Sequence, residues 1–95
     1  MAQYRIVHWR DIPSLVEAVD GEHTARRPLS QRFQDLIDAV AMREGASGTE
    51  AYLEGWGLGH DIERPGGAEA VAEEVAAELE AAFPDLVARR LVPPA

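Results

Sequence analysis

The sequence predicts an α+β domain in which helices cover one small antiparallel sheet of three or four strands. Three observations predict this class. β-branched and aromatic residues recur in the N-terminal part, a periodic apolar stripe runs through about residues 29–44, and an alanine- and glutamate-rich stretch covers about 68–82. The first pattern is typical of strands, and the other two are typical of helices that pack on a sheet.

The N-terminal part is expected to form an antiparallel meander. Residues 4–9 and 12–19 are rich in β-branched and aromatic residues and are expected to be strands. The Asp-Gly pair at 20–21 predicts a tight turn, after which residues 23–27 form a third strand. A sheet this small is marginal by itself, so a helix must cover it.

The helix expected over about residues 29–44 is the natural cover for this sheet. Its apolar residues have the spacing i, i+3, i+4, i+7 and i+8, which places them on one face. Ser30 is expected to be its N-cap, and Gly45 suits the left-handed position after its last turn. The stripe consists of Phe33, Leu36, Ile37, Val40 and Ala41.

A short helix is expected over about residues 48–55. Ser47 and Glu50 have the spacing of a capping box at its start. The run of alternate glycines over residues 55–59 is expected to end it, and residues 60–64 are a candidate fourth strand at the sheet edge.

The last main helix is expected over about residues 68–82, because alanine and glutamate are strong helix formers. Pro84 disfavours helical geometry at Phe83, so this helix should end there. Residues 85–91 are expected to add a last helical turn or two.

The composition predicts one globular domain over residues 1–95, with an ordered core over about 3–91 and a frayed tail at 92–95. The net charge of −8 disfavours nucleic acids and anionic membranes as partners. No stretch reaches the roughly 20 apolar residues of a membrane-spanning helix, so a cytoplasmic location is expected. The chain has no cysteine and no lysine, which excludes thiolate nucleophiles and lysine Schiff bases.

Several separated blocks resemble, in order, a bacterial family known simply as virulence factor. They are Trp-Arg-Asp-Ile-Pro-Ser at 9–14, Leu-Ser-Gln-Arg-Phe-Gln at 29–34, Ile-Asp at 37–38, Ala-Met-Arg at 41–43 and Tyr-Leu-Glu-Gly-Trp at 52–56. The resemblance covers roughly residues 4–82 and extends to the C-terminal module of conserved virulence factor C proteins, where it follows helical repeats. It implies a module that works beside other domains, and it supplies no catalytic residues. A weaker alternative is an association with corrinoid and folate methyl-transfer enzymes.

No catalytic, metal or cofactor site is predicted from the residues. Ser30 and Ser47 are interpreted as helix caps and not as nucleophiles. The glycine run over 55–59 closes a helix, whereas a phosphate-binding loop opens one. The carboxylates of the last main helix are interpreted as its solvated face, and they are Glu69, Glu73, Glu74, Glu78 and Glu80.

Two groups of residues are candidate binding sites. Trp9, Trp56, Tyr52, Arg26 and Arg27 are candidates for contact with a protein partner, because tryptophan and arginine are common anchors at interfaces. Burial of the aromatic rings and ion pairs within the chain are the simpler interpretation of the same residues. The candidate ligand pocket consists of His8, His23 and His60, should the strands bring them together.

Two functional hypotheses follow. The first is a non-catalytic module that binds an unidentified protein partner, with a homodimer through exposed strand edges as a further expectation. The second is a small-ligand-binding or enzyme-accessory protein with its pocket on the sheet. The sequence favours the first hypothesis and leaves enzymatic activity open.

Overall fold

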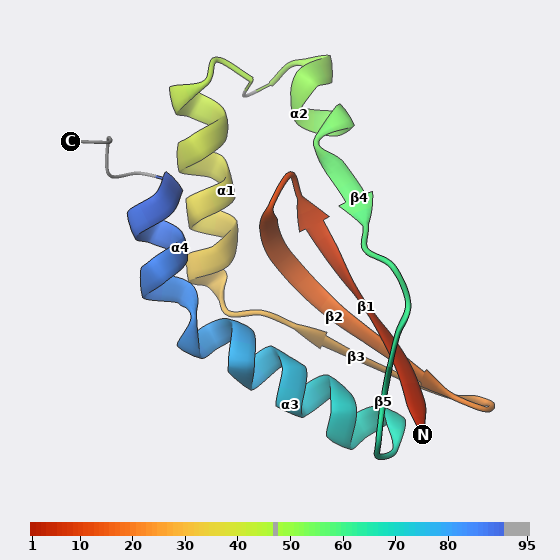
Figure 1. The fold of residues 1–95 in the computed structure, drawn as a ribbon. Helices are drawn as coiled ribbons and strands as arrows, with labels where there is room; N and C mark the ends of the chain where they lie inside the picture. The colour runs from red at the N-terminus through yellow and green to blue at the C-terminus, as the bar shows by residue number, and fades with distance from the viewer. Residues whose placement is uncertain (47, 91–95) are drawn as a thin grey trace.

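Over the described part of the chain, the protein is an α+β fold with a five-stranded antiparallel sheet and four helices (Figure 1). The structure is a computed structural model, and it describes residues 1–46 and 48–90. The predicted fold class and the N-terminal meander are confirmed. In chain order the elements are β1 (Ala2–Trp9), β2 (Ile12–Asp20), β3 (His23–Pro28), α1 (Gln31–Arg43), α2 (Glu50–Glu54), β4 (Trp56–Leu58), β5 (Ile62–Arg64), α3 (Ala68–Ala81) and α4 (Phe83–Arg90).

The sheet has the order β3-β2-β1-β4, and β5 also pairs with β1. Its first three strands are joined by two consecutive hairpins. In the tight turn between β2 and β3, Gly21 supplies the required positive φ of 62°. On the far side of β1, β4 pairs with the end of the strand and β5 with its beginning. β1 is therefore an inner strand, although it comes first in the chain.

β4 is an element that the sequence prediction missed. Gly55 ends α2 as expected, but the stretch from Trp56 to Leu58 that follows pairs with β1 and was not expected to be a strand. The expected strand at residues 60–64 is confirmed as the shorter β5. Glycine is a poor strand former, so the local sequence gives little sign that this segment is extended.

One buried cluster, the α3 cluster, joins α3 to one face of the sheet. All eight of its buried members are alanine or valine, which allows the helix to approach the strands closely. Tyr4, Ile6 and Leu79 pack at its border. The buried members are Ala2, Val16, Ala18, Ala25, Ala68, Val71, Ala72 and Val75.

A second buried cluster, the α1 cluster, joins α1 to the turn between β1 and β2 and to α4. All five residues of the predicted stripe on α1 are buried, as expected. Phe33 also meets Phe83 of α4 edge-on, with ring centroids 4.8 Å apart. The buried members are Trp9, Ile12, Phe33, Leu36, Ile37, Val40, Ala41, Ala46 and Leu86.

The helix boundaries require three corrections to the sequence interpretation. Ser30 occupies the N-cap position of α1, but its side chain makes no capping hydrogen bond and instead donates to Glu80 Oε1 over 2.7 Å. The N-cap of α2 is Thr49 and not Ser47, which lies outside the described residues. After α3 ends at Ala81, α4 starts at Phe83, which is earlier than the expected 85. Pro84 is accommodated in the first turn of α4, where its missing N–H costs nothing.

Candidate functional site

Beyond Trp9 and Ile12, which belong to the α1 cluster, the sheet face opposite α3 carries side chains that belong to neither buried cluster. Strand pairing places Arg5 opposite Glu17, and Val7 opposite Leu15. Successive residues of a strand point to opposite faces, so these side chains lie on the face away from Tyr4 and Ile6. We call this surface the open face, and it consists of Gln3, Arg5, Val7, Leu15, Glu17, Val19, Arg26 and Leu58.

The open face has an apolar row. Leu58 pairs with Val7, and Val7 pairs with Leu15, so the three side chains stand next to one another on neighbouring strands. Leu58 is 59% exposed. Val19, which lies beyond Glu17 on β2, is 42% exposed. Within the row, Leu58 is exposed to water, whereas Val7 and Leu15 are half-buried.

A charged row lies beside the apolar row. The carboxylate of Glu17 accepts hydrogen bonds from Nε and Nη2 of Arg5, over 3.0 and 2.6 Å. Arg26, on the other neighbouring strand, places its Nε 3.2 Å from the second oxygen of Glu17. One carboxylate is thus shared by two guanidinium groups, and the Arg26 side chain remains 63% exposed.

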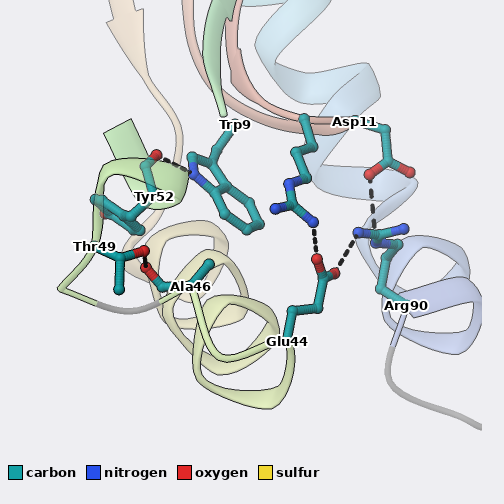
Figure 2. Close-up of polar contacts among 8 residues, drawn as sticks. Trp9, Asp11, Glu44, Ala46, Thr49, Tyr52 and Arg90 are labelled. Carbon is teal, nitrogen blue, oxygen red and sulfur yellow. Dashed lines mark hydrogen bonds and ion pairs between the residues drawn. The ribbon is translucent and has the colours of Figure 1, made fainter. Parts of the chain in front are cut away.

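Trp9 is buried, and so it contributes to the core and not to the surface. Figure 2 shows its indole N–H donating to the backbone oxygen of Tyr52 over 2.7 Å. The rings of Trp9 and Tyr52 are 5.8 Å apart, and Trp56 meets Tyr52 edge-on at 6.2 Å. A Cβ atom on Gly55 would lie 2.4 Å from Trp9 Nε1, so the tryptophan requires glycine at this position.

The turn between β1 and β2 is held by an ion-pair network (Figure 2). Arg10, whose φ is 52°, forms an ion pair with Glu44 at the end of α1. Arg90 of α4 reaches the same carboxylate over 3.3 Å and pairs with Asp11 over 3.3 Å. The Arg90 Nε–Asp11 contact is an ion pair without hydrogen-bond geometry. The network therefore joins the β1–β2 turn, the end of α1 and α4, and its charged side chains are paired within the fold.

Most glutamates of α3 do more than form a solvated face, which corrects the sequence interpretation. Glu73 pairs with Arg27 at 3.8 Å, whereas Glu74 and Glu78 both pair with Arg64 of β5. The hydrogen bond from Arg64 lowers the pKa of Glu78 below its usual value, and the same bond raises the pKa of Arg64.

Glu80 joins the end of α3 to the start of α1. It accepts hydrogen bonds from the backbone N–H and hydroxyl of Ser30, both over 2.7 Å, and it pairs with Arg32 at 3.0 Å. Burial acts to raise the pKa of Glu80, but the hydrogen bonds from Ser30 and Arg32 outweigh it and hold the pKa below its usual value. This carboxylate is therefore a structural tie between two helices.

The structure does not bring the three histidines together. β1 and β3 are separated by β2, so His8 and His23 are not neighbours, and His60 is exposed between β4 and β5. His8 lines an open hollow of about 330 Å³ with Ile6, Pro13, Gly59, Leu79 and the Arg10–Asp11 turn. Its buried Nδ1 has no hydrogen-bond partner among the residues that the structure describes. Within residues 1–46 and 48–90, no three histidine or acidic side chains are placed to hold a metal ion.

Of the charged row, only Arg26 was predicted from the sequence as a binding residue, and Arg5 and Glu17 were not. Arg5 and Glu17 are 12 positions apart in the sequence, and the β1–β2 hairpin brings them next to each other. Their pairing could be found from the sequence only with the register of the β1–β2 hairpin. An irregularity between Val7 and His8 shifts that register, and no local signal marks it.

Comparison with known proteins gives one family match. A family model described as "Virulence factor" matches residues 7–92, which is most of the chain. No curated protein and no solved structure matches the chain. The resembling blocks at 9–14 and 52–56 meet in space, because Trp9 contacts Tyr52 and Gly55. In the described part of the chain, no helix combines the length and the hydropathy needed to cross a bilayer.

Proposed function

Because the chain belongs to the virulence factor family, we propose that it is a non-catalytic protein-binding module that works beside other domains. The family description states a phenotype and names no reaction. The observation that carries the proposal is the open face. On it an apolar row with one exposed member, Leu58, lies beside a row of two arginines around one carboxylate.

The apolar row supports a protein as the partner. Leu58, Val7 and Leu15 form an aliphatic strip across three strands, which suits the packing of another protein's side chains. Burying these side chains would remove apolar surface from water and favour association. Trp9 and Tyr52, in contrast, are engaged with each other and are not part of this surface.

The charged row supports a partner that carries a carboxylate beside its apolar contact. Arg5 and Arg26 share Glu17, so this row has a net charge of +1 on a chain with a net charge of −8. Such local complementarity contributes specificity and orientation more than affinity. Arg27, the other arginine of the doublet, faces Glu73 and is outside the open face.

Site-specific photo-crosslinking in the native host tests this surface. A photoreactive phenylalanine analogue at Leu58 or at Val19 is expected to give adducts with the same protein, because both positions are on the open face. The control position is Ala77, which is exposed on α3. Absence of adducts from both open-face positions, or equal adducts from Ala77, would contradict the proposal.

Affinity for the protein so identified provides the quantitative test. Leu58→Asp is expected to weaken binding at least about tenfold, because it places a charge in the apolar row. Leu53→Asp is the matched control, because Leu53 is 69% exposed but lies on α2. Arg26→Glu should also weaken binding and reduce its dependence on salt. Equal losses in the Leu58 and Leu53 variants would count against the open face.

A small-ligand-binding role is the second candidate. The hollow beside His8 favours it, because its lining is mainly apolar and the buried Nδ1 atom has no partner within residues 1–46 and 48–90. Chemical-shift changes of His8, Ile6 and Leu79 during a screen of small organic acids would support this role. A screen that leaves these three residues unperturbed would remove it.

A further inference from the structure

We infer that the protein binds a small monocarboxylic acid with an apolar body, in a groove between the β1–β2 turn and the junction of α3 and α4. This inference rests on the small-ligand role, the second candidate function, and it adds the chemistry of the ligand. It does not depend on the open face, because Ile6, which lines the groove, points to the other face of the sheet.

Two neighbouring hollows form this groove. The first is the hollow of about 330 Å³ beside His8, and the second has a volume of about 130 Å³. They share Asp11, Pro13 and Leu79, so they lie next to each other along the same wall. We call the two hollows together the turn groove. The second hollow is lined by Asp11, Pro13, Leu79, Ala82, Leu86 and Arg89.

Apolar side chains make up much of the wall of the turn groove. Ile6, Pro13 and Leu79 line the wide hollow, and Leu86 lines the narrow one. Ile6 and Leu79 pack only at the border of the α3 cluster, so both keep surface that a ligand can cover. Covering this surface removes it from water and favours the binding of an apolar ligand body.

The glycines of β4 and of the segment after it leave the wide hollow unfilled. Gly59 lines this hollow, and a Cβ atom there would meet only backbone atoms of Ile6, at 3.4 and 3.7 Å. Gly57 is opposite His8, and a Cβ atom there would lie 3.2 Å from Cε1 of the imidazole. Because neither residue has a side chain, the imidazole edge is not covered from this strand.

Arg89 provides the positive charge that selects a carboxylate. It lines the narrow hollow, and among the residues described its guanidinium has no ion pair and no hydrogen bond. The other charged groups of the turn groove, Arg10 and Asp11, are already paired with Glu44 and Arg90. A guanidinium binds a carboxylate through two parallel hydrogen bonds, so Arg89 can hold the acid group at the exposed end of the groove.

The net charge of −8 favours a ligand with one negative charge over a polyanion. Exposed charges farther apart than the Debye length, about 8 Å at physiological ionic strength, are largely screened. A small monoanion therefore senses mainly Arg89 and not the distant carboxylates. Asp85, one turn before Arg89 on α4, lines neither hollow.

The β1–β2 turn, which forms one wall of the turn groove, is fixed before a ligand binds. The N–H of Arg10 donates to the backbone oxygen of Gly55 over 2.7 Å, and Asp11 pairs with Arg90 over 3.3 Å. A wall that is already in place reduces the ordering cost of binding.

Titration of the ¹⁵N-labelled full chain with three probes tests the inference. The probes are 3-phenylpropionate, its neutral amide and the cationic 3-phenylpropylamine. NMR follows the backbone amides of His8 and Leu79 and the Nε–H group of Arg89. The acid is expected to bind with a dissociation constant of about 1 mM or lower, as a ligand of this size can. It should bind at least about fivefold more tightly than the amide, and more tightly still than the amine.

Two pairs of variants locate the site. Ala82→Trp should weaken binding of the acid at least about tenfold, because its ring fills the narrow hollow. Ala81→Trp is the matched control, because Ala81 is also exposed but lines neither hollow. Arg89→Gln should abolish the preference for the acid over the amide. Arg26→Gln, on the open face, should leave this preference unchanged.

Equal binding of the acid and the amide, or an unchanged preference in Arg89→Gln, would overturn the inference and leave the small-ligand role standing. Equal effects of Ala82→Trp and Ala81→Trp would exclude the turn groove as the site. Unperturbed His8 and Leu79 signals with all three probes would remove the small-ligand role as well.

The crosslinks from Leu58 separate this inference from the protein-binding proposal. They are expected to persist in Arg89→Gln, because Leu58 is on the open face. Their loss in this variant alone would show that the partner protein covers the turn groove, which would overturn the assignment of a small acid to it.

Discussion

Close packing around Trp9 explains why glycine occupies position 55. The backbone oxygen of Gly55 accepts a hydrogen bond from the N–H of Arg10 over 2.7 Å, which fixes Gly55 against the turn. The indole ring of Trp9 fills the space that a side chain would need, and its N–H is bound to Tyr52. Neither side can move without losing a buried hydrogen bond.

Gly55→Ala is therefore expected to destabilise the protein by about 1–3 kcal/mol, which is typical of overpacking in a core. Gly59→Ala is the matched control, because its Cβ would meet the Ile6 oxygen at an ordinary contact distance of 3.4 Å. Urea unfolding followed by tryptophan fluorescence measures both variants. Equal stability of the two variants would show that Trp9 can move aside.

At the scale of elements, α1 provides most of the interior of the α1 cluster. Its five stripe residues face Trp9 and Ile12 on one side and α4 on the other. Met42 lies on the same helix and is 71% exposed. The helix is therefore stabilised mainly by what one face buries.

Ile37→Ala is expected to reduce the free energy of unfolding by about 2–5 kcal/mol, because it leaves a cavity between α1 and the sheet. Met42→Ala should change it by less than about 0.5 kcal/mol, as exposed substitutions usually do. Urea titrations of both variants check this difference. A similar loss in the two variants would mean that α1 is not packed as described.

Elements whose sequence pattern is local could be predicted, and those defined by distant partners could not. The stripe on α1 and the Asp20–Gly21 turn carry their own signals, so the helix and the meander were expected correctly. β4 depends on its pairing with β1, in which Gly57 lies opposite His8 and a Cβ on Gly57 would lie 3.2 Å from the imidazole ring. The tie between Ser30 and Glu80 joins residues 50 positions apart, and capping was the reasonable local interpretation of that serine.

At the scale of the whole molecule, ion pairs with α3 connect parts of the chain that are far apart in sequence. Arg27, Arg32 and Arg64 each pair with a glutamate of this helix. The pairs are largely exposed, so each one contributes little by itself. Together they make the stability of the protein depend on pH, because the carboxylates must stay ionised.

Stability is expected to fall as the pH drops below about 4.5, the usual pKa of a glutamate side chain. The pKa values of Glu78 and Glu80 are lowered in the folded protein, so the unfolded chain takes up protons first. The stabilisation is therefore complete above this pH and is lost as the pH falls through the folded-state pKa values.

Urea unfolding between pH 3 and 7 measures the effect. Glu80→Gln should make the unfolding midpoint fall less steeply below pH 4.5, because one of the linked carboxylates is gone. Glu69→Gln is the control on the same helix, because Glu69 is exposed and makes no ion pair among the described residues. An unchanged slope in Glu80→Gln would contradict this account of the tie.

The inner position of β1 has a consequence for synthesis of the chain. As the protein leaves the ribosome, β1 pairs at once with β2, but its other neighbours are not translated until residues 56–64. During that interval the nascent hairpins expose an unprotected edge of β1 that contains Ile6 and Val7. Completion of the sheet thus depends on a late and weakly strand-forming segment, and ribosomes that stall before it would release an aggregation-prone fragment.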